Sequence, residues 1–259
     1  MNTEQFCLYY QPIVSLSGES IDTVLGVEAL LRLDPGDGQP LLTPAAFFDK
    51  LDHPRFARKI GVFALETAVA QWLRWQAKGL RLRVAVNISA SYLLDSRFLT
   101  DLTDILENYP DFPVDQLEIE ITESAPLRNL ELAAKVLTSC KEKGIRIALD
   151  DFGTGYASLT YIQHLPVDSI KIDQTFVRAL FENKKSKAIV GAIISGAAEL
   201  GMEVIAEGIE TPVCVDALQK LGCQYLQGYF IARPMPPNEI FTWAERAAEK
   251  NKSFKFLAI

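Results

Sequence analysis

The chain has few of the residues that build soft-metal or disulfide sites. It contains two histidines, His53 and His164, among 259 residues. Its four cysteines are scattered, and none belongs to a Cys-x-x-Cys pair. This composition is poor material for a zinc site and weak support for a disulfide framework. We therefore expect a reducing, cytoplasmic environment, and we expect both histidines to be bystanders.

The sequence also lacks a long apolar run, an excess of basic charge and any low-complexity tract. Its most apolar stretch, 188–198, is interrupted by glycine and serine and is shorter than the ~20 residues of a membrane span. No signal-peptide pattern opens the chain. A net charge of −7 argues against binding a DNA or RNA polymer or an anionic membrane. With 49% hydrophobic residues, we expect residues 1–259 to form a single globular domain without a membrane segment.

Short β-type segments alternate with longer helical patterns along the chain. Strands are expected at 7–15, 23–31, 82–88, 116–121, 145–149, 169–172, 203–206 and 224–226. Helices are expected at 55–78, 91–108, 129–143, 184–200, 212–221 and 238–250. Such alternation predicts a parallel sheet with helices outside it.

The parity of charged residues within these strands favours a closed barrel over an open sheet. Glu118 and Glu120 share one face of their strand, and isoleucines take the other. Asp150 and Lys171 occupy the corresponding face of their own strands. An open sheet covered by helices on both faces would bury all these charges. We therefore predict an α/β fold, a TIM-like (β/α)8 barrel with an irregular or antiparallel first strand.

Asp150 and Asp151 stand side by side at the end of an apolar segment, and a glycine-punctuated loop, 152–156, follows them. Adjacent carboxylates repel each other unless a cation lies between them, so the pair predicts a metal site. Taken alone, an Asp-Asp pair is more simply a helix cap or a turn. Polar residues at the other strand ends add candidates: Glu28, Asn87, Glu120, Lys171, Glu207 and Gln227. Apart from Lys171 these offer oxygen ligands, which suit Mg²⁺ or Mn²⁺.

The order of these motifs resembles the EAL family of bacterial cyclic di-GMP phosphodiesterases. A single Glu-Ala-Leu tripeptide, here Glu28-Ala29-Leu30, is common by chance and means little. The similarity, however, runs from Tyr10-Gln11-Pro12 to Arg233-Pro234-Met235-Pro236. Between them lie Asn87-Ile88-Ser89, Glu120-Ile121-Thr122-Glu123, Asp150-Asp151-Phe152-Gly153-Thr154-Gly155-Tyr156, Ile170-Lys171-Ile172-Asp173, Ala206-Glu207-Gly208-Ile209-Glu210 and Gln227-Gly228-Tyr229.

The resemblance implies a role for each candidate. One divalent ion is expected at the residues matching Glu28, Asn87, Glu120 and Asp150. Asp150 and Asp151 help to bind a second ion, and Glu207 and Gln227 orient metal-bound water. Lys171 contacts the nucleophilic water, and Glu123 steadies the loop after Asp151. Gln11 and Arg32, together with Glu28, contact the bound dinucleotide.

The activity implied by the resemblance is hydrolysis of cyclic di-GMP to linear pGpG by a two-metal mechanism, which lowers the level of a bacterial second messenger. Mg²⁺ or Mn²⁺ is the expected cofactor, with two ions per site, and Ca²⁺ is expected to inhibit. A homodimer is expected, as are fused sensor or cyclase domains in a longer protein. One departure is Ala157, where the family usually has serine; it removes a hydroxyl but no metal ligand.

Simpler structural roles compete with these assignments. Asn87 could cap the following helix, and Lys171 could be a buried ion-pair lysine. Glu28 and Glu207 could be salt-bridged glutamates of the barrel. Asp173 is most simply a helix N-cap, and Glu210 a loop carboxylate.

Two other functions also compete with the phosphodiesterase. The first is a degenerate, catalytically inactive receptor module that binds cyclic di-GMP without cutting it. The second keeps only the barrel and makes Lys171 the base of a metal-assisted lyase or enolising enzyme. Degeneration normally removes ligands, and here every expected ligand is present, so we favour the phosphodiesterase.

Overall fold

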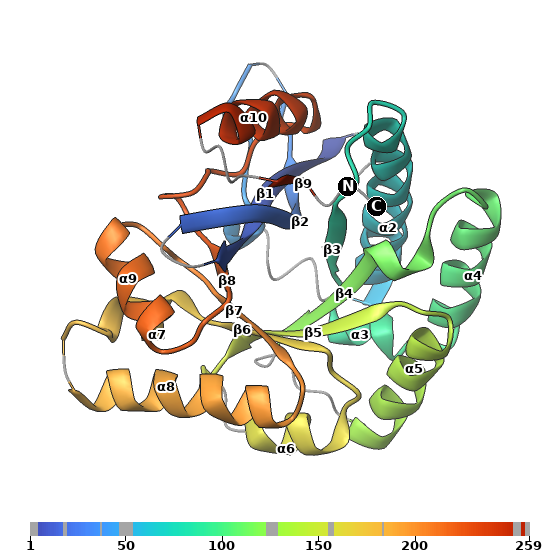
Figure 1. Ribbon diagram of the computed structural model, residues 1–259. Coiled ribbons are helices and arrows are strands. Elements are labelled where there is room, and N and C mark those ends of the chain that lie inside the picture. Colours follow the sequence, from blue (N-terminus) through green and yellow to red (C-terminus); the bar gives the residue numbers. More distant parts are fainter. Residues whose placement is uncertain are drawn as a thin grey trace.

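Eight strands close into a barrel, and helices cover its outer surface (Figure 1). The computed structural model describes residues 5–17, 20–36, 38–46, 54–122, 129–154, 158–182, 184–250 and 255–256. The barrel strands are β1 (Phe6–Ser17), β2 (Ser20–Leu33), β3 (Arg83–Asn87), β4 (Leu117–Thr122), β5 (Arg146–Phe152), β6 (Ser169–Ile172), β7 (Glu203–Ala206) and β8 (Tyr225–Gln227). A short ninth strand, β9 (Lys255–Phe256), pairs with β2 outside the barrel circuit.

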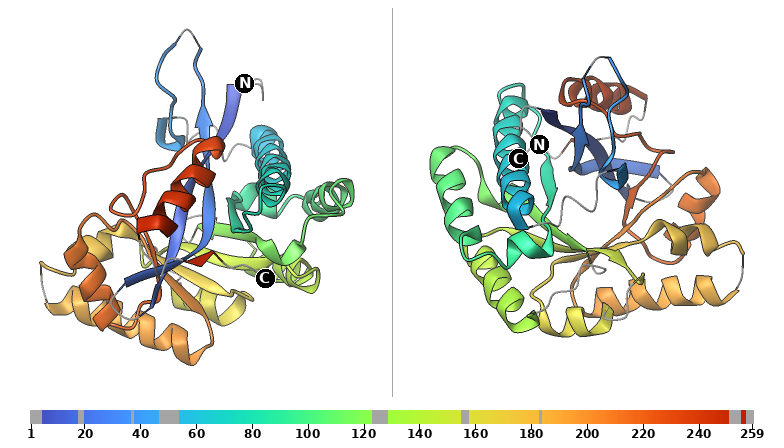
Figure 2. Two further views of the ribbon diagram at one scale, coloured as in Figure 1. Left: turned by 45° about the horizontal axis from the view of Figure 1, so that its top comes forward. Right: turned by 180° about the vertical axis from the view of Figure 1, so that it is seen from behind.

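The barrel closes through its first strand. Strands β2 to β8 pair in parallel in chain order. Strand β1 runs antiparallel to both β2 and β8, so it joins the two edges. Figure 2 shows the long β1–β2 hairpin from two further sides. The predicted (β/α)8 barrel with an antiparallel first strand is therefore confirmed.

The helices follow the strands around the barrel. They are α2 (Pro54–Gln76), α3 (Ala90–Leu93), α4 (Phe98–Asn108), α5 (Leu130–Glu142), α6 (Ser158–His164), α7 (Gln174–Ala179), α8 (Lys184–Glu199), α9 (Pro212–Lys220) and α10 (Pro237–Lys250). Two 3₁₀ turns, η2 (Pro44–Ala46) and η3 (Val114–Gln116), complete the described elements. Their boundaries follow local signals: Thr211 caps α9 ahead of Pro212, and Gly144 (φ +95°) follows α5 in a left-handed conformation.

The longest helix, α2, shows how the outer layer packs. Its buried side chains recur at helical spacing and include Leu65, Ala68, Trp72 and Trp75. The Trp72 indole nitrogen donates to the carbonyl of Leu82 at 2.6 Å, which satisfies its polar group within the core. Burial of this apolar stripe against the strands stabilises the barrel from outside.

The predicted helix at 91–108 is wrong in one respect, because the structure contains two helices there. The chain leaves α3 after Leu93 and begins α4 at Phe98. Between them the Asp95 carboxylate accepts a hydrogen bond from the backbone nitrogen of Arg97 and pairs with the same residue's guanidinium. Such a local side-chain bond competes with helical bonding.

Helices α6 and α7 were not predicted, because each is seven residues or shorter and therefore has little periodicity. Asp173 caps α7 by accepting from the backbone nitrogen of Thr175, as predicted. No helix within the described ranges has the length and apolar character to cross a membrane.

We predict that Leu137→Ala lowers the free energy of unfolding by about 2–5 kcal/mol, because Leu137 of α5 is fully buried. Urea denaturation followed by circular dichroism measures the change. Leu132→Ala on the same helix is the control, since Leu132 is 39% exposed and should change stability by no more than about 0.5 kcal/mol. Equal losses in the two variants would contradict this packing.

Candidate metal centre

Five carboxylates cluster inside the barrel, and four of them contact one ammonium. They belong to Glu28, Glu120, Asp150, Asp151 and Glu207, which come from β2, β4, β5 and the segment just after β7. The carboxyl ends of parallel barrel strands meet at one mouth, which brings these residues together. Glu28 differs from the prediction in one detail: it lies within β2, because that strand continues to Leu33 beside β1.

Lys171 lies at the centre of the cluster and is fully buried. Its Nζ is 2.8 Å from Glu207 Oε1 and 3.0 Å from Glu120 Oε1. It is also 3.2 Å from Glu28 Oε2 and 3.5 Å from Asp150 Oδ1. One ammonium therefore holds four carboxylates, which explains how they tolerate close approach.

Two amide side chains complete the layer around Glu28. The Nδ2 of Asn87 donates to Glu28 Oε1 at 2.7 Å, which leaves the amide oxygen of Asn87 as a ligand atom. The Nε2 of Gln227 donates to Glu28 Oε2 at 2.7 Å and to Gln11 Oε1 at 3.3 Å. The alternative role of Asn87 as a helix cap is not observed, since Ser89 caps α3.

Asp150 and Asp151 serve the same site although they are sequence neighbours. On a regular strand, adjacent side chains point to opposite faces. Asp151, however, has φ of 55°, the one positive value at a non-glycine among the described residues. The β5–β6 register also shifts between Leu149 and Phe152. This local departure brings ligand atoms of Asp150, Asp151 and Glu207 within 4.8 Å of one another.

The donor set fits divalent cations. When ionised, the five carboxylates carry five negative charges against one positive charge on Lys171, so four charges lack compensation within the described residues. Two divalent ions would supply that charge. Two groups are suitable for them, Glu28 with Glu120 and Asp150, and Asp150 with Asp151 and Glu207. Asp150 belongs to both groups.

Unsatisfied polar atoms mark the same place. Glu120 Oε2 and Gln227 Oε1 are buried and accept no hydrogen bond from the described residues, and Glu120 Oε1 has the ion pair with Lys171. A buried oxygen without a partner is costly, and a bound cation or water would relieve that cost.

Burial and the excess negative charge raise the pKa values of three acids in the cluster. Burial, followed by the repulsion of Glu28, raises the pKa of Glu120 well above its usual range. Burial raises the pKa of Glu207 to about 8, and Asp150 adds to the effect against the attraction of Lys171. Burial and the neighbouring Asp150 raise the pKa of Asp151 to about 6. Glu120 and Glu207 therefore favour the protonated form near neutral pH in the metal-free protein, whereas Asp151 is mostly ionised there.

The pKa values of Glu28 and Lys171 shift in the direction that favours their charged forms. Burial opposes ionisation of Glu28, but Lys171 and the hydrogen bonds from Gln227 and Asn87 together lower its pKa. Burial likewise disfavours the charged form of Lys171, yet the surrounding carboxylates raise its pKa well above the ordinary value. The lysine is therefore an ammonium, which does not favour the alternative in which Lys171 is the base of a lyase or enolising enzyme.

A pocket of about 310 Å³ opens beside the cluster. Its lining includes the predicted residues Gln11, Glu28, Asp150, Glu207 and Gln227. It also includes Gln174, Arg178 and Tyr229, which sequence reasoning missed. Gln174 and Arg178 could have been suspected, because α7 follows β6 at the same mouth of the barrel.

Arg32 was predicted to contact the dinucleotide, but the structure does not bring it to the pocket. Arg32 donates to the carbonyl of Leu31 at 2.8 Å, lies over the ring of Tyr9 and does not line the pocket. Glu123 lies outside the described residues, as do His53 and Ala157. The proposed contacts of Arg32 and Glu123 stay predictions.

Comparison with known proteins agrees with this geometry. The EAL domain family model matches residues 1–234. The chain belongs to the EAL domain family. It is 40% identical over 244 residues to a Pseudomonas aeruginosa protein named cyclic di-GMP phosphodiesterase PA2567, covering 94% of this chain and 40% of that protein. It is 36% identical to cyclic di-GMP phosphodiesterase PdeR of Escherichia coli, covering 95% of this chain and 36% of PdeR.

The fold also matches a solved EAL structure. The PaMucR phosphodiesterase in complex with c-di-GMP superposes with a TM-score of 0.83 at 33% identity, covering 92% of this chain and 94% of the other. The chain spans 40% or less of the two curated relatives described above. Homodimerisation and fused sensor or cyclase domains stay predictions.

We predict that the metal-free protein loses stability as the pH rises from about 5 to about 8.5. Asp151 and Glu207 bind protons more tightly when folded than when unfolded, where their pKa is near 4. Deprotonation above pH 4 therefore favours the unfolded chain, until each group passes its folded pKa near 6 or 8. Thermal unfolding in EDTA measures the trend. Glu207→Gln should reduce the fall in melting temperature at the upper end of this pH range. A melting temperature that rises with pH would contradict the account.

Proposed function

We propose that this EAL domain hydrolyses cyclic di-GMP to linear pGpG in a reaction that depends on two Mg²⁺ or Mn²⁺ ions. The observation that carries the proposal is the cluster of five carboxylates and one ammonium beside an open pocket. The names of the relatives support the substrate, since PA2567 and PdeR are called cyclic di-GMP phosphodiesterases.

Glu28, Asn87, Glu120 and Asp150 would hold one ion, and Asp150, Asp151 and Glu207 the other. When bound, such ions lower the pKa of water and stabilise charge on an attacked phosphate. The shared carboxylate of Asp150 would set the separation of the two positions.

Lys171 and Gln227 would orient the attacking water. The Lys171 ammonium can donate a hydrogen bond to the water oxygen, and the unpartnered Oε1 of Gln227 can accept one from it. In the reaction the water oxygen bonds to phosphorus and one bridging phosphorus–oxygen bond breaks. The released oxygen takes a proton, which opens the ring at one phosphodiester.

Glu28, Gln11 and Arg32 would contact the dinucleotide. Gln11 lines the pocket, although its Nε2 already donates to the carbonyl of Ala232 at 3.0 Å. Its Nε2 keeps a second N–H for a ligand, and its Oε1, which accepts from Gln227 at 3.3 Å, keeps a second lone pair. Arg32 would need to leave the Leu31 carbonyl to reach a phosphate or a base.

We predict that Glu28→Gln and Asp151→Asn each lower kcat/KM for cyclic di-GMP at least about a hundredfold, because each removes a charged ligand rather than an outer partner of one. Chromatographic separation of cyclic di-GMP, pGpG and GMP in Mg²⁺ or Mn²⁺ measures turnover. Glu131→Gln is the control, since Glu131 is an exposed carboxylate paired only with Lys135 on α5.

The outcomes separate the two functions of this site. Wild-type protein that binds cyclic di-GMP in calorimetry but forms no pGpG with either metal would establish the inactive receptor module instead. Wild-type rates in both variants would show that the cluster is not the reaction site.

A further inference from the structure

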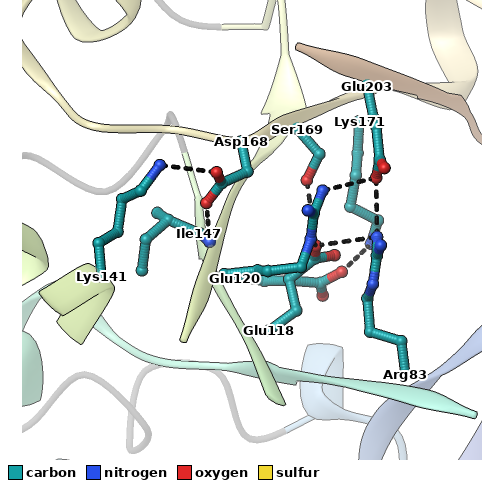
Figure 3. Close-up of polar contacts among 10 residues, drawn as sticks. Arg83, Glu118, Glu120, Lys141, Ile147, Asp168, Ser169, Lys171 and Glu203 are labelled. Carbon is teal, nitrogen blue, oxygen red and sulfur yellow. Dashed lines mark hydrogen bonds and ion pairs between the residues drawn. The ribbon is translucent and has the colours of Figure 1, made fainter. Parts of the chain in front are cut away.

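A second charged layer lies toward the amino-terminal mouth of the barrel, where β3, β5 and β7 begin. Figure 3 shows ion pairs of this layer. Arg83 Nη1 is 2.7 Å from Glu203 Oε2 and 3.4 Å from Glu118 Oε2. Arg146 reaches the same two carboxylates, with its Nη2 2.7 Å from Glu203 Oε2 and its Nε 3.3 Å from Glu118 Oε2. We call Arg83, Glu118, Arg146 and Glu203 the basal brace.

Through Glu203, the basal brace joins strands that do not pair with each other, β3 with β7 and β5 with β7. Strands β3 and β7 lie four places apart in the closed circuit of eight, so they are on opposite sides of the barrel. The Arg83–Glu203 contact therefore spans the interior. Glu118 on β4 and Arg146 on β5 close the remaining gap between the two sides.

The composition of the basal brace favours a geometric role over a stabilising one. Two guanidiniums balance two carboxylates, and Glu118 is 1% exposed. The other three side chains are partly buried, with exposures of 15% to 26%. Ion pairs at this depth add little net stability, because desolvation offsets their attraction. Charged hydrogen bonds, however, fix distance and direction.

Each strand of the basal brace also carries a candidate metal ligand. Asn87 lies four residues after Arg83, Glu120 two after Glu118, Asp150 four after Arg146 and Glu207 four after Glu203. Four strand residues span about 13 Å. A tilt or shift of one strand at the brace would therefore displace a ligand at the opposite mouth.

We propose that the basal brace positions the metal cluster by fixing strands β3, β4, β5 and β7 relative to one another across the barrel. Arg83 and Arg146 are positioning residues in this role and do not touch the cluster. The inference rests on the proposed function only in requiring that the cluster bind divalent ions.

Replacing Arg83 tests the proposal, because electrostatics and loss of positioning change the metal affinity in opposite directions. Arg83→Met removes a positive charge, which by electrostatics alone would tighten cation binding. Loss of positioning has the opposite effect. We expect Arg83→Met to weaken Mn²⁺ binding about tenfold, at the lower end of the loss seen when a partner behind a metal ligand is removed. Calorimetric titration with Mn²⁺ alone, or electron paramagnetic resonance of free Mn²⁺, measures the affinity.

Two further variants make the comparison decisive. Lys141→Met is the matched control, because it removes the same charge at the same mouth from a pair with Asp168 that does not cross the barrel. Its Mn²⁺ affinity should not fall. The double variant Arg83→Met/Glu203→Met removes one charge of each sign and keeps the Arg146–Glu118 pair. It replaces Arg83→Met in the comparison if that single variant does not fold. We expect the same tenfold loss in the double variant.

Circular dichroism at the assay temperature verifies that each variant is folded, so that lower stability cannot imitate weaker binding. Unchanged or tighter Mn²⁺ binding in a folded brace variant overturns the inference, as does wild-type protein that binds no Mn²⁺. Wild-type protein that binds Mn²⁺ but does not hydrolyse cyclic di-GMP contradicts the proposed function alone, and the affinity comparison still decides the role of the brace.

Discussion

Mutual repulsion among carboxylates is the constraint around which the upper half of this barrel is organised. Glu28, Glu120, Asp150 and Glu207 all lie within 3.5 Å of the Lys171 ammonium, which compensates one of their charges. The rest of the charge must be neutralised by protons or by added cations. Burial together with this imbalance raises the pKa values of Glu120 and Glu207, and Asp150 belongs to both groups of residues that could hold an ion.

The fold separates this charge from its apolar surroundings by the alternation of strand side chains. The outer faces of the strands pack against helices such as α2 and α5, and the inner faces carry polar groups in layers. The metal cluster occupies the carboxyl-terminal mouth, and the basal brace lies toward the other, since its residues precede the ligands on their strands. Between them lie small side chains such as Ala85 and Ala148, both buried. A (β/α) barrel suits such a site because its strand ends converge without needing long loops.

Much of this arrangement could be predicted from the sequence. The alternation of Glu118 and Glu120 with isoleucines indicated an inward charged face, and both glutamates are buried there. Strands β6 and β7 have the predicted limits, because each is a short β-type segment between clear helical patterns. The motif order indicated the EAL family before any geometry was known, and the family match confirms it.

Other features could not be predicted because they depend on contacts between distant segments. The Arg83–Glu203 pair joins residues 120 positions apart, and nothing local distinguishes it from two surface charges. The left-handed conformation of Asp151 is set by its surroundings, since aspartate only tolerates it. Arg32 was expected at the substrate, yet its guanidinium lies against Leu31 and Tyr9, which a motif cannot reveal.

Proton release on metal binding tests the central claim most directly. Calorimetric titration with Mn²⁺ at pH 7, repeated in buffers of different ionisation enthalpy, gives both the number of ions and the number of protons displaced. If excess carboxylate charge is held by protons in the metal-free protein, two ions bind and at least one proton is released, from Glu120 or Glu207. Binding of Mn²⁺ without proton release, or no binding at all, would contradict the account.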